Sequence, residues 1–128
     1  LVLELFALLA RRADGAARSE PAPRWLERAR ERVDDRFADR FSVADIARDV
    51  GVHPAHLARE FRRHFAVPIG EYGRRLRLDA AAVRLATTDD SLAEIAYASG
   101  FAHQSHFTHA FKRHTGLTPA RYRASTRR

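Results

Sequence analysis

Residues 91–116 read SLAEIAYASGFAHQSHFTHAFKRHTG, and residues 42–66, which read SVADIARDVGVHPAHLAREFRRHFA, repeat the same pattern. The Ser, the Ile-Ala pair and the Gly recur at an offset of 49 residues, and after one inserted residue a His, a Phe and an Arg-His pair recur at an offset of 50. Two copies are too few for a solenoid, so they indicate a duplicated supersecondary unit.

Each copy opens with the signals of a short helix. Ser42 with Asp45, and Ser91 with Glu94, have the spacing of a capping box, in which a hydroxyl and a carboxylate satisfy free backbone N–H groups. A glycine follows where the chain needs a left-handed residue to end the helix and enter a turn. These glycines are Gly51 and Gly100.

A second helix is predicted after each turn, from about Pro54 to His64 and from about Gln104 to His114. Apolar residues four positions apart give each of these helices an inward face, and the opposite face is left polar. The inward residues are Leu57 and Phe61 in the first copy, and Phe107 and Phe111 in the second.

Further helices are predicted between and around the copies. Apolar residues that step by three or four over residues 69–87 indicate one amphipathic helix, roughly 27 Å long at 1.5 Å per residue, which would act as a rigid spacer. That stripe is Ile69, Tyr72, Leu76, Ala80, Val83 and Thr87, and a similar one upstream is Leu26, Ala29, Val33 and Phe37. Thr118 and Pro119 start a last short helix. Because no segment alternates like a strand, we expect an all-α fold of about seven helices in which two helix-turn-helix lobes are joined by a long linker helix.

Charge is distributed unevenly along the chain. Residues 1–50 carry ten Arg and ten acids, whereas residues 51–128 carry twelve Arg and one Lys against six acids, so the net charge of +7 lies entirely on the second stretch. Such asymmetry indicates a surface that binds a polyanion.

Several classes of protein are disfavoured. The absence of cysteine argues against disulfides, zinc ribbons and thiol nucleophiles, and fits a reducing cytoplasm. The longest apolar run is far shorter than the roughly 20 residues that span a bilayer. No nucleophile motif, phosphate loop or paired-ligand spacing organises the polar residues, so we expect no enzyme and no cofactor.

The duplicated pattern resembles the AraC/XylS family of bacterial transcription regulators. The resemblance covers about residues 25–124. It rests on Ile46-Ala47, Gly51-Val52 and Leu57 in the first copy, and in the second on residues 95–101, Ser105-His106-Phe107, Phe111-Lys112-Arg113 and residues 118–123. It implies seven helices in two lobes, each of which inserts its second helix into the major groove of double-stranded DNA. Successive major-groove faces lie about 34 Å apart, and the predicted spacer helix is long enough to hold the two lobes at that separation.

The resemblance also implies which residues contact DNA. Base contacts fall near the start of each recognition helix, at Ala55, Ala58, Arg59, Gln104, Ser105, Thr108 and His109. Arg59 can grip guanine and Gln104 can grip adenine through paired hydrogen bonds. Because two alanines head the first recognition helix, Arg59 is its main polar reader. Phosphate contacts are expected one or two turns further on, at Arg62, Arg63, Lys112 and Arg113.

We therefore expect the DNA-binding domain of a bacterial transcription regulator, most simply an activator that contacts RNA polymerase. Residues 1–24 would end a preceding effector and dimerisation domain, with an extra helix at Leu1–Arg12 and a linker at 13–24, and residues 25–128 would form the DNA-binding domain. Within it, lobe one is expected at about 25–68, the linker helix at 69–87 and lobe two at 88–124. A chain that starts at Leu1 and has no methionine fits a piece of a longer, dimeric protein. The alternative is a helical protein-interaction module, although such a module has no reason to confine the positive charge to one part of the chain.

Other aromatic and histidine residues receive simpler interpretations. Trp25 is expected to pack in the first helix, and Tyr97 and Phe101 in the core. His103, His106 and His109 repeat at helical spacing, but no acid or cysteine completes a metal site, and His106 aligns with His56, which favours a shared structural role. His64 and His114 are expected to pack or to cap.

Overall fold

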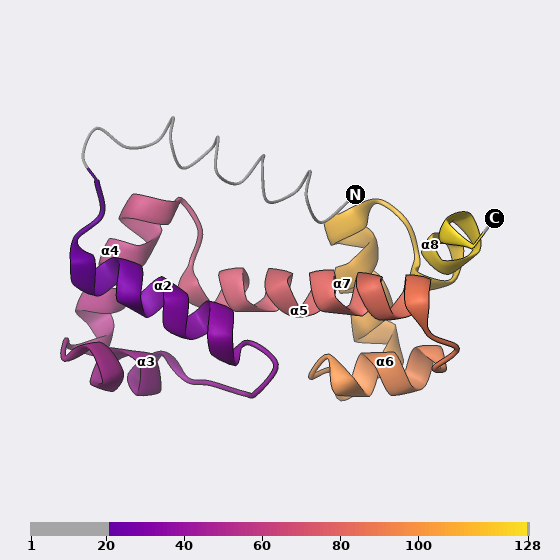
Figure 1. The fold of residues 1–128 in the computed structure, drawn as a ribbon, viewed down its shortest axis with the longest axis horizontal. Helices are drawn as coiled ribbons and strands as arrows, with labels where there is room; N and C mark the ends of the chain where they lie inside the picture. Colours follow the sequence, from indigo (N-terminus) through magenta and orange to yellow (C-terminus); the bar gives the residue numbers. More distant parts are fainter. Residues whose placement is uncertain (1–20, 128) are drawn as a thin grey trace. The chain divides into compact units, whose positions relative to one another are not determined.

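A computed structural model describes residues 21–127, which form seven helices and no strand (Figure 1). The helices are α2 (Arg24–Arg36), α3 (Val43–Val50), α4 (Pro54–Phe65), α5 (Ile69–Thr87), α6 (Leu92–Ala98), α7 (Gln104–Thr115) and α8 (Pro119–Thr126). The predicted all-α fold is confirmed, as are the two helix-turn-helix pairs, α3–α4 and α6–α7, and the long helix over 69–87. The helix predicted at Leu1–Arg12 and the linker residues 13–20 lie outside the described residues.

The chain divides into two compact units, and the boundary between them lies between Gly73 and Arg74, inside α5. Lobe one here denotes the described residues up to Gly73, and lobe two denotes residues 74–127. Among these described residues, no helix is long and apolar enough to cross a bilayer.

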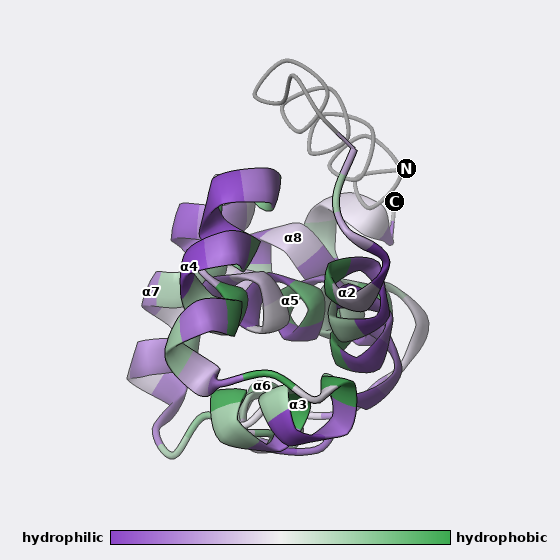
Figure 2. Cartoon of the chain, turned by 90° about the vertical axis from the view of Figure 1, so that its left-hand side faces the viewer, coloured by the Kyte–Doolittle hydropathy of each residue, from purple (hydrophilic) through white to green (hydrophobic). Residues whose placement is uncertain are grey.

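Lobe one packs α2 and α4 with the short helix α3. The α2 residues Leu26, Ala29 and Val33 are fully buried, as predicted, together with Leu57 and Phe61 of α4. In Figure 2, hydrophilic residues run along much of α4, whereas α2 and α3 carry both hydrophilic and hydrophobic sides. Separate hydrophilic and hydrophobic sides are typical of a helix that places one face in the core and exposes the other to solvent.

The predicted helix starts and glycine turns are confirmed in both lobes, but of α3 and α6 only α3 has the complete capping box. Ser42 Oγ accepts a hydrogen bond from the backbone N–H of Asp45, and the Asp45 carboxylate accepts one from the backbone N–H of Ser42. In lobe two, Ser91 Oγ accepts from the backbone N–H of Glu94 at 3.0 Å. Gly51 (φ 75°) and Gly100 (φ 89°) take the left-handed conformation that starts each turn.

Lobe two uses the second half of α5 as its first helix. Leu78, Ala81 and Leu85 are buried with Phe107 and Phe111 of α7. These three α5 residues follow Leu26, Ala29 and Val33 of α2 at a constant offset of 52 residues, so the internal repeat extends to the helix that precedes each helix-turn-helix pair.

The apolar stripe predicted along α5 is wrong in its second half. Val83 is 44% exposed and Thr87 is exposed, whereas Leu78, Ala82 and Leu85 are buried. The reason is that α5 contributes to two separate cores, with Ile69 and Gly73 buried in lobe one, so its buried positions need not form one continuous line.

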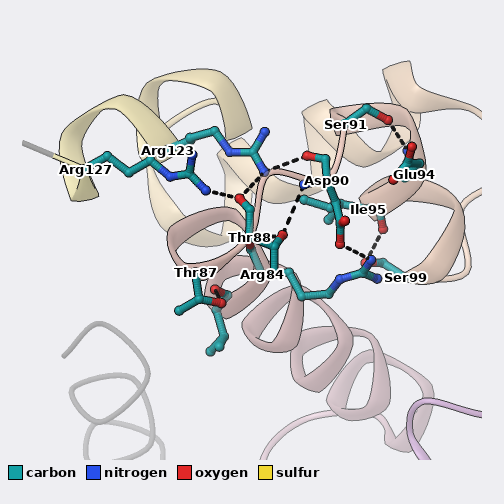
Figure 3. Close-up of polar contacts among 11 residues, drawn as sticks. Arg84, Thr87, Thr88, Asp90, Ser91, Glu94, Ile95, Ser99, Arg123 and Arg127 are labelled. Carbon is teal, nitrogen blue, oxygen red and sulfur yellow. Dashed lines mark hydrogen bonds and ion pairs between the residues drawn. The ribbon is translucent and has the colours of Figure 1, made fainter.

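Arg123 of α8 and Arg127, the residue after α8, bind backbone carbonyls at and just beyond the C-terminal end of α5 (Figure 3). Arg123 donates hydrogen bonds to the backbone carbonyls of Leu85 and Thr88, both at 3.1 Å, and of Asp90 at 2.7 Å. Arg127 donates to the Thr88 carbonyl and pairs with Asp89. Carbonyls at a helix C-terminus lack intrahelical partners, and cationic side chains there also interact favourably with the helix dipole.

Candidate nucleic-acid interface

The outward face of α4 holds the residues expected to contact DNA in lobe one. Because Leu57 and Phe61 point into the core, the residues on the opposite side of the helix are exposed. The exposed set is Ala55, Ala58, Arg59, Arg62 and Arg63.

The outward face of α7 corresponds to it in lobe two. Phe107 and Phe111 are fully buried, and the expected contact residues lie on the other side. Gln104, Ser105, His109, Lys112 and Arg113 are exposed, and Thr108 is half-buried. Five of these α7 positions align with the five exposed α4 positions at an offset of 50, so each lobe presents an equivalent face.

Histidines precede both α4 and α7 but act differently. His53 Nδ1 accepts a hydrogen bond from the backbone N–H of Ala55 at 3.1 Å, so this imidazole serves as the cap of α4. His103 stands at the same place before α7 and makes no side-chain cap hydrogen bond. Both helices nevertheless begin where the sequence predicts, at Pro54 and Gln104.

Aromatic contacts hold α4 within lobe one. The Trp25 ring stacks on His56 with 5.1 Å between ring centroids and 28° between planes, which confirms Trp25 as a packing residue. Phe61 meets Phe65 edge to face, and the Arg30 guanidinium lies over Phe65, 4.5 Å from its centroid. The predicted shared role of His56 and His106 is wrong, because His106 is exposed.

A buried ionisable pair fixes the last turn of α7. His114 Nε2 lies 2.6 Å from Asp79 Oδ1 of α5, with only 7% and 16% of the two side chains exposed. Burial, and to a lesser extent the Asp79 charge, raise the pKa of the Tyr122 phenol, which packs in the same core. In lobe one the buried His64 lies 3.6 Å from Glu60. Both histidines thus pack, as predicted.

Phe101 and Tyr97 of lobe two differ in burial. Phe101 packs partly buried against the lobe-two core, as expected. The prediction for Tyr97 is wrong, because it is 80% exposed on α6: a helix of only seven residues buries Ile95 and Ala96 and leaves their neighbour Tyr97 outside. Within residues 21–127, no group of three His, Asp or Glu side chains could hold a metal ion.

The electrostatics of the two faces follow from their ion pairs. In the described part of the chain, Arg59, Arg62 and Lys112 take part in no ion pair, so their charges are available to a ligand. Arg63 is different, because its guanidinium lies 3.2 Å from the Glu60 carboxylate. The two faces therefore present exposed cations and hydrogen-bond donors, which suit an anionic, polar ligand.

Known proteins share this arrangement. Residues 24–125 match the family described as "Helix-turn-helix domain". The HTH-type transcriptional activator AarP of Providencia stuartii is 38% identical over 73% of this chain and 69% of its own length. Several other curated relatives are longer, and the chain spans 49%, 28% and 40% of three of them.

Solved structures agree. A transcriptional regulator from Chromobacterium violaceum, described as containing an AraC-type DNA-binding domain, superposes with a TM-score of 0.74 at 30% identity over 80% of this chain and 91% of its own. The DNA-binding domain of AdpA, solved in complex with a target DNA, superposes with a TM-score of 0.71 at 25% identity over 80% of this chain and 92% of that domain.

Proposed function

The chain belongs to the AraC-type helix-turn-helix family of DNA-binding transcription regulators, and from this premise we propose that α4 and α7 are its recognition helices. Each would enter the major groove with its exposed face toward the bases. The observation that carries the proposal is that four aligned positions of the second helix are exposed in both lobes, whereas the apolar pairs Leu57/Phe61 and Phe107/Phe111 are fully buried. A fifth aligned position is exposed at Ala58 and half-buried at Thr108.

The chemistry of each exposed side chain assigns its role. Arg59 suits bidentate donation to guanine, Gln104 suits adenine, and Ala55 or Ala58 can rest against a thymine methyl group. Ser105, Thr108 and His109 complete the base-contacting set in lobe two. Arg62, Arg63, Lys112 and Arg113 would contact phosphates, because they lie further along the same two helices.

For the whole protein we propose a transcription activator in the bacterial cytoplasm that contacts RNA polymerase and dimerises through a domain outside this chain. The name of AarP supports activation. The rival function, a helical protein-interaction module, is disfavoured by the concentration of all +7 charges in residues 51–128.

Selection from random duplexes, followed by substitution of Arg59, tests the base-reading role. We expect a recovered site with two half-elements about one turn apart. Arg59→Ala should weaken binding by about 1 to 3 kcal/mol, with the loss concentrated at one guanine. Arg59→Lys keeps the charge but loses the planar fork, so specificity should fall more than affinity. If both variants lose affinity equally for the selected and for random DNA, Arg59 is a phosphate contact and the proposed docking register is wrong.

A further inference from the structure

One edge of the recognition helix differs sharply between the two lobes. In each lobe, four positions separated by three, four and three residues lie along one side of the second helix, and the first of them is the residue just before that helix. The lobe-one edge is His53, His56, Glu60 and Arg63, and the lobe-two edge is His103, His106, Ala110 and Arg113.

The lobe-one edge is satisfied within its own lobe. His53 accepts the hydrogen bond that caps α4, and His56 is half-buried in a stack on Trp25. Glu60 holds Arg63 at 3.2 Å, with only 18% of the Glu60 side chain exposed. The two histidines are therefore committed to partners inside the lobe, and Glu60 offsets part of the positive charge of the exposed Arg63.

The lobe-two edge faces solvent. His103 and His106 are both exposed, and their rings meet edge to face with 5.6 Å between centroids. No cap hydrogen bond engages the His103 side chain, and Ala110 takes the place of Glu60. Arg113 is exposed and, within residues 21–127, has no ion pair.

The sequence of α5 explains why His106 has no counterpart of the stack between Trp25 and His56. The offset of 52 that aligns α2 with the second half of α5 places Arg77 where lobe one has Trp25. The flat surface on which His56 stacks is thus absent at the aligned position of lobe two. His106 consequently stays outside although its neighbour Phe107 is fully buried.

We propose that His103 and His106 bind phosphate beside Arg113, so that the whole lobe-two edge contacts the DNA backbone and makes lobe two the anchoring lobe on DNA; this rests on the proposed function. Imidazole N–H groups and a guanidinium donate to phosphate oxygens, which is the commonest kind of protein–DNA contact. His106 lies one turn before His109 and one position after Ser105, so the edge borders the proposed base-contacting face. The lobe-two edge would bind the sugar-phosphate backbone that borders the groove entered by α7.

The first test substitutes the histidines in the full chain and measures its affinity for the selected duplex at pH 7.5. His103→Ala and His106→Ala should each weaken binding about 3- to 10-fold, the range of one lost hydrogen bond, without lowering the melting temperature. The matched controls, His53→Ala and His56→Ala, should lower the melting temperature of lobe one instead. Replacing the contacted phosphate in the lobe-two half-site with a methylphosphonate should abolish the effect of His106→Ala, as expected for coupled partners.

The second test exchanges the central residue of the two edges. Glu60→Gln should release Arg63 from its ion pair and strengthen DNA binding about two- to fivefold. The slope of log affinity against log salt concentration should become steeper by about 0.9. Ala110→Glu should restrain Arg113 and have the reverse effect, and Ala110→Gln controls for the added bulk at this half-buried position.

The outcomes separate the two proposals. If the wild-type chain binds the selected duplex, and His103→Ala and His106→Ala both bind it as tightly as wild type does, this inference is overturned and the proposed function stands. A histidine effect that persists on the methylphosphonate duplex would also overturn it, because the side chain would not be touching that strand. If the wild-type chain binds no duplex, the proposed function fails and this inference fails with it.

Discussion

Replacement of Arg123 should destabilise lobe two selectively. This residue donates three hydrogen bonds from α8 to the carbonyls of Leu85, Thr88 and Asp90, and so joins the last helix to the end of α5. Arg123→Met keeps much of the aliphatic bulk and removes all three donors. The three carbonyls would then rely on water or remain unsatisfied.

The magnitude follows from the number and exposure of these bonds. A hydrogen bond that involves a charged group contributes about 1.5 to 3 kcal/mol when buried. Arg123 is half-buried, so we discount each bond to about 1 kcal/mol for solvent screening and expect a loss of roughly 2 to 4 kcal/mol in total. That is a large fraction of the roughly 5 to 15 kcal/mol that stabilises a typical domain. Arg123→Lys, which keeps one compact donor, should lose about half as much.

Amide hydrogen exchange is the suitable assay because it resolves the two lobes. Protection in α6, α7 and α8 should fall while protection in α2, α3 and α4 is retained. Arg121→Met is the matched control, because Arg121 is exposed about half a turn away on the same helix. Its replacement should be nearly neutral. Equal loss of protection in both lobes, or an Arg123→Met variant as stable as Arg121→Met, would refute the reasoning.

Three further predictions concern charge, acid stability and packing. If six to eight phosphates are neutralised, the logarithm of the affinity should fall with the logarithm of salt at a slope of roughly −5 to −7, and Lys112→Ala should flatten it by about one without changing the preferred sequence; a salt-independent affinity would contradict this. Hydrogen bonds from Ser42 lower the pKa of Asp45 below its ordinary value of 3.8, so the stability that this carboxylate contributes is complete above that value and is lost as the pH falls through the lower, folded-state pKa. The difference in urea midpoint between wild type and Asp45→Asn should therefore be larger at pH 6 than at pH 2.5. A Cβ on Gly73 would lie 2.8 Å from two ring atoms of Phe41, whereas one on Gly70 meets nothing within 4 Å, so in thermal unfolding Gly73→Ala should be about 1 kcal/mol or more less stable than Gly70→Ala.

The contrast between predicted and observed residues shows what local sequence can determine. The starts of α3, α6 and α4 and the glycine turns after α3 and α6 were predictable, because caps, left-handed glycines and first-turn prolines act within a few residues of the chain. The start of α7 has no such signal and was predictable from its alignment with α4 in the repeat. The exposed faces of α4 and α7 followed from the same local rule, since the spacing of Leu57 and Phe61, or of Phe107 and Phe111, decides which residues lie opposite them.

Tertiary structure decided the properties that depend on partners distant in sequence. Tyr97 and Ile95 lie on opposite sides of α6, and the position of α7 against α6 decides that the side of Ile95 is buried and that of Tyr97 exposed. His56 and His106 are aligned in the repeat, yet one stacks on Trp25, 31 residues earlier, and the other faces solvent because no aromatic residue stands at the corresponding place. The pairing of His114 with Asp79, 35 residues away, is likewise set by the packing of α7 against α5. Local spacing thus determines the helices and their outward faces, whereas burial, ring stacking and ion pairing require the neighbour that folding brings, because these interactions act over only a few ångströms.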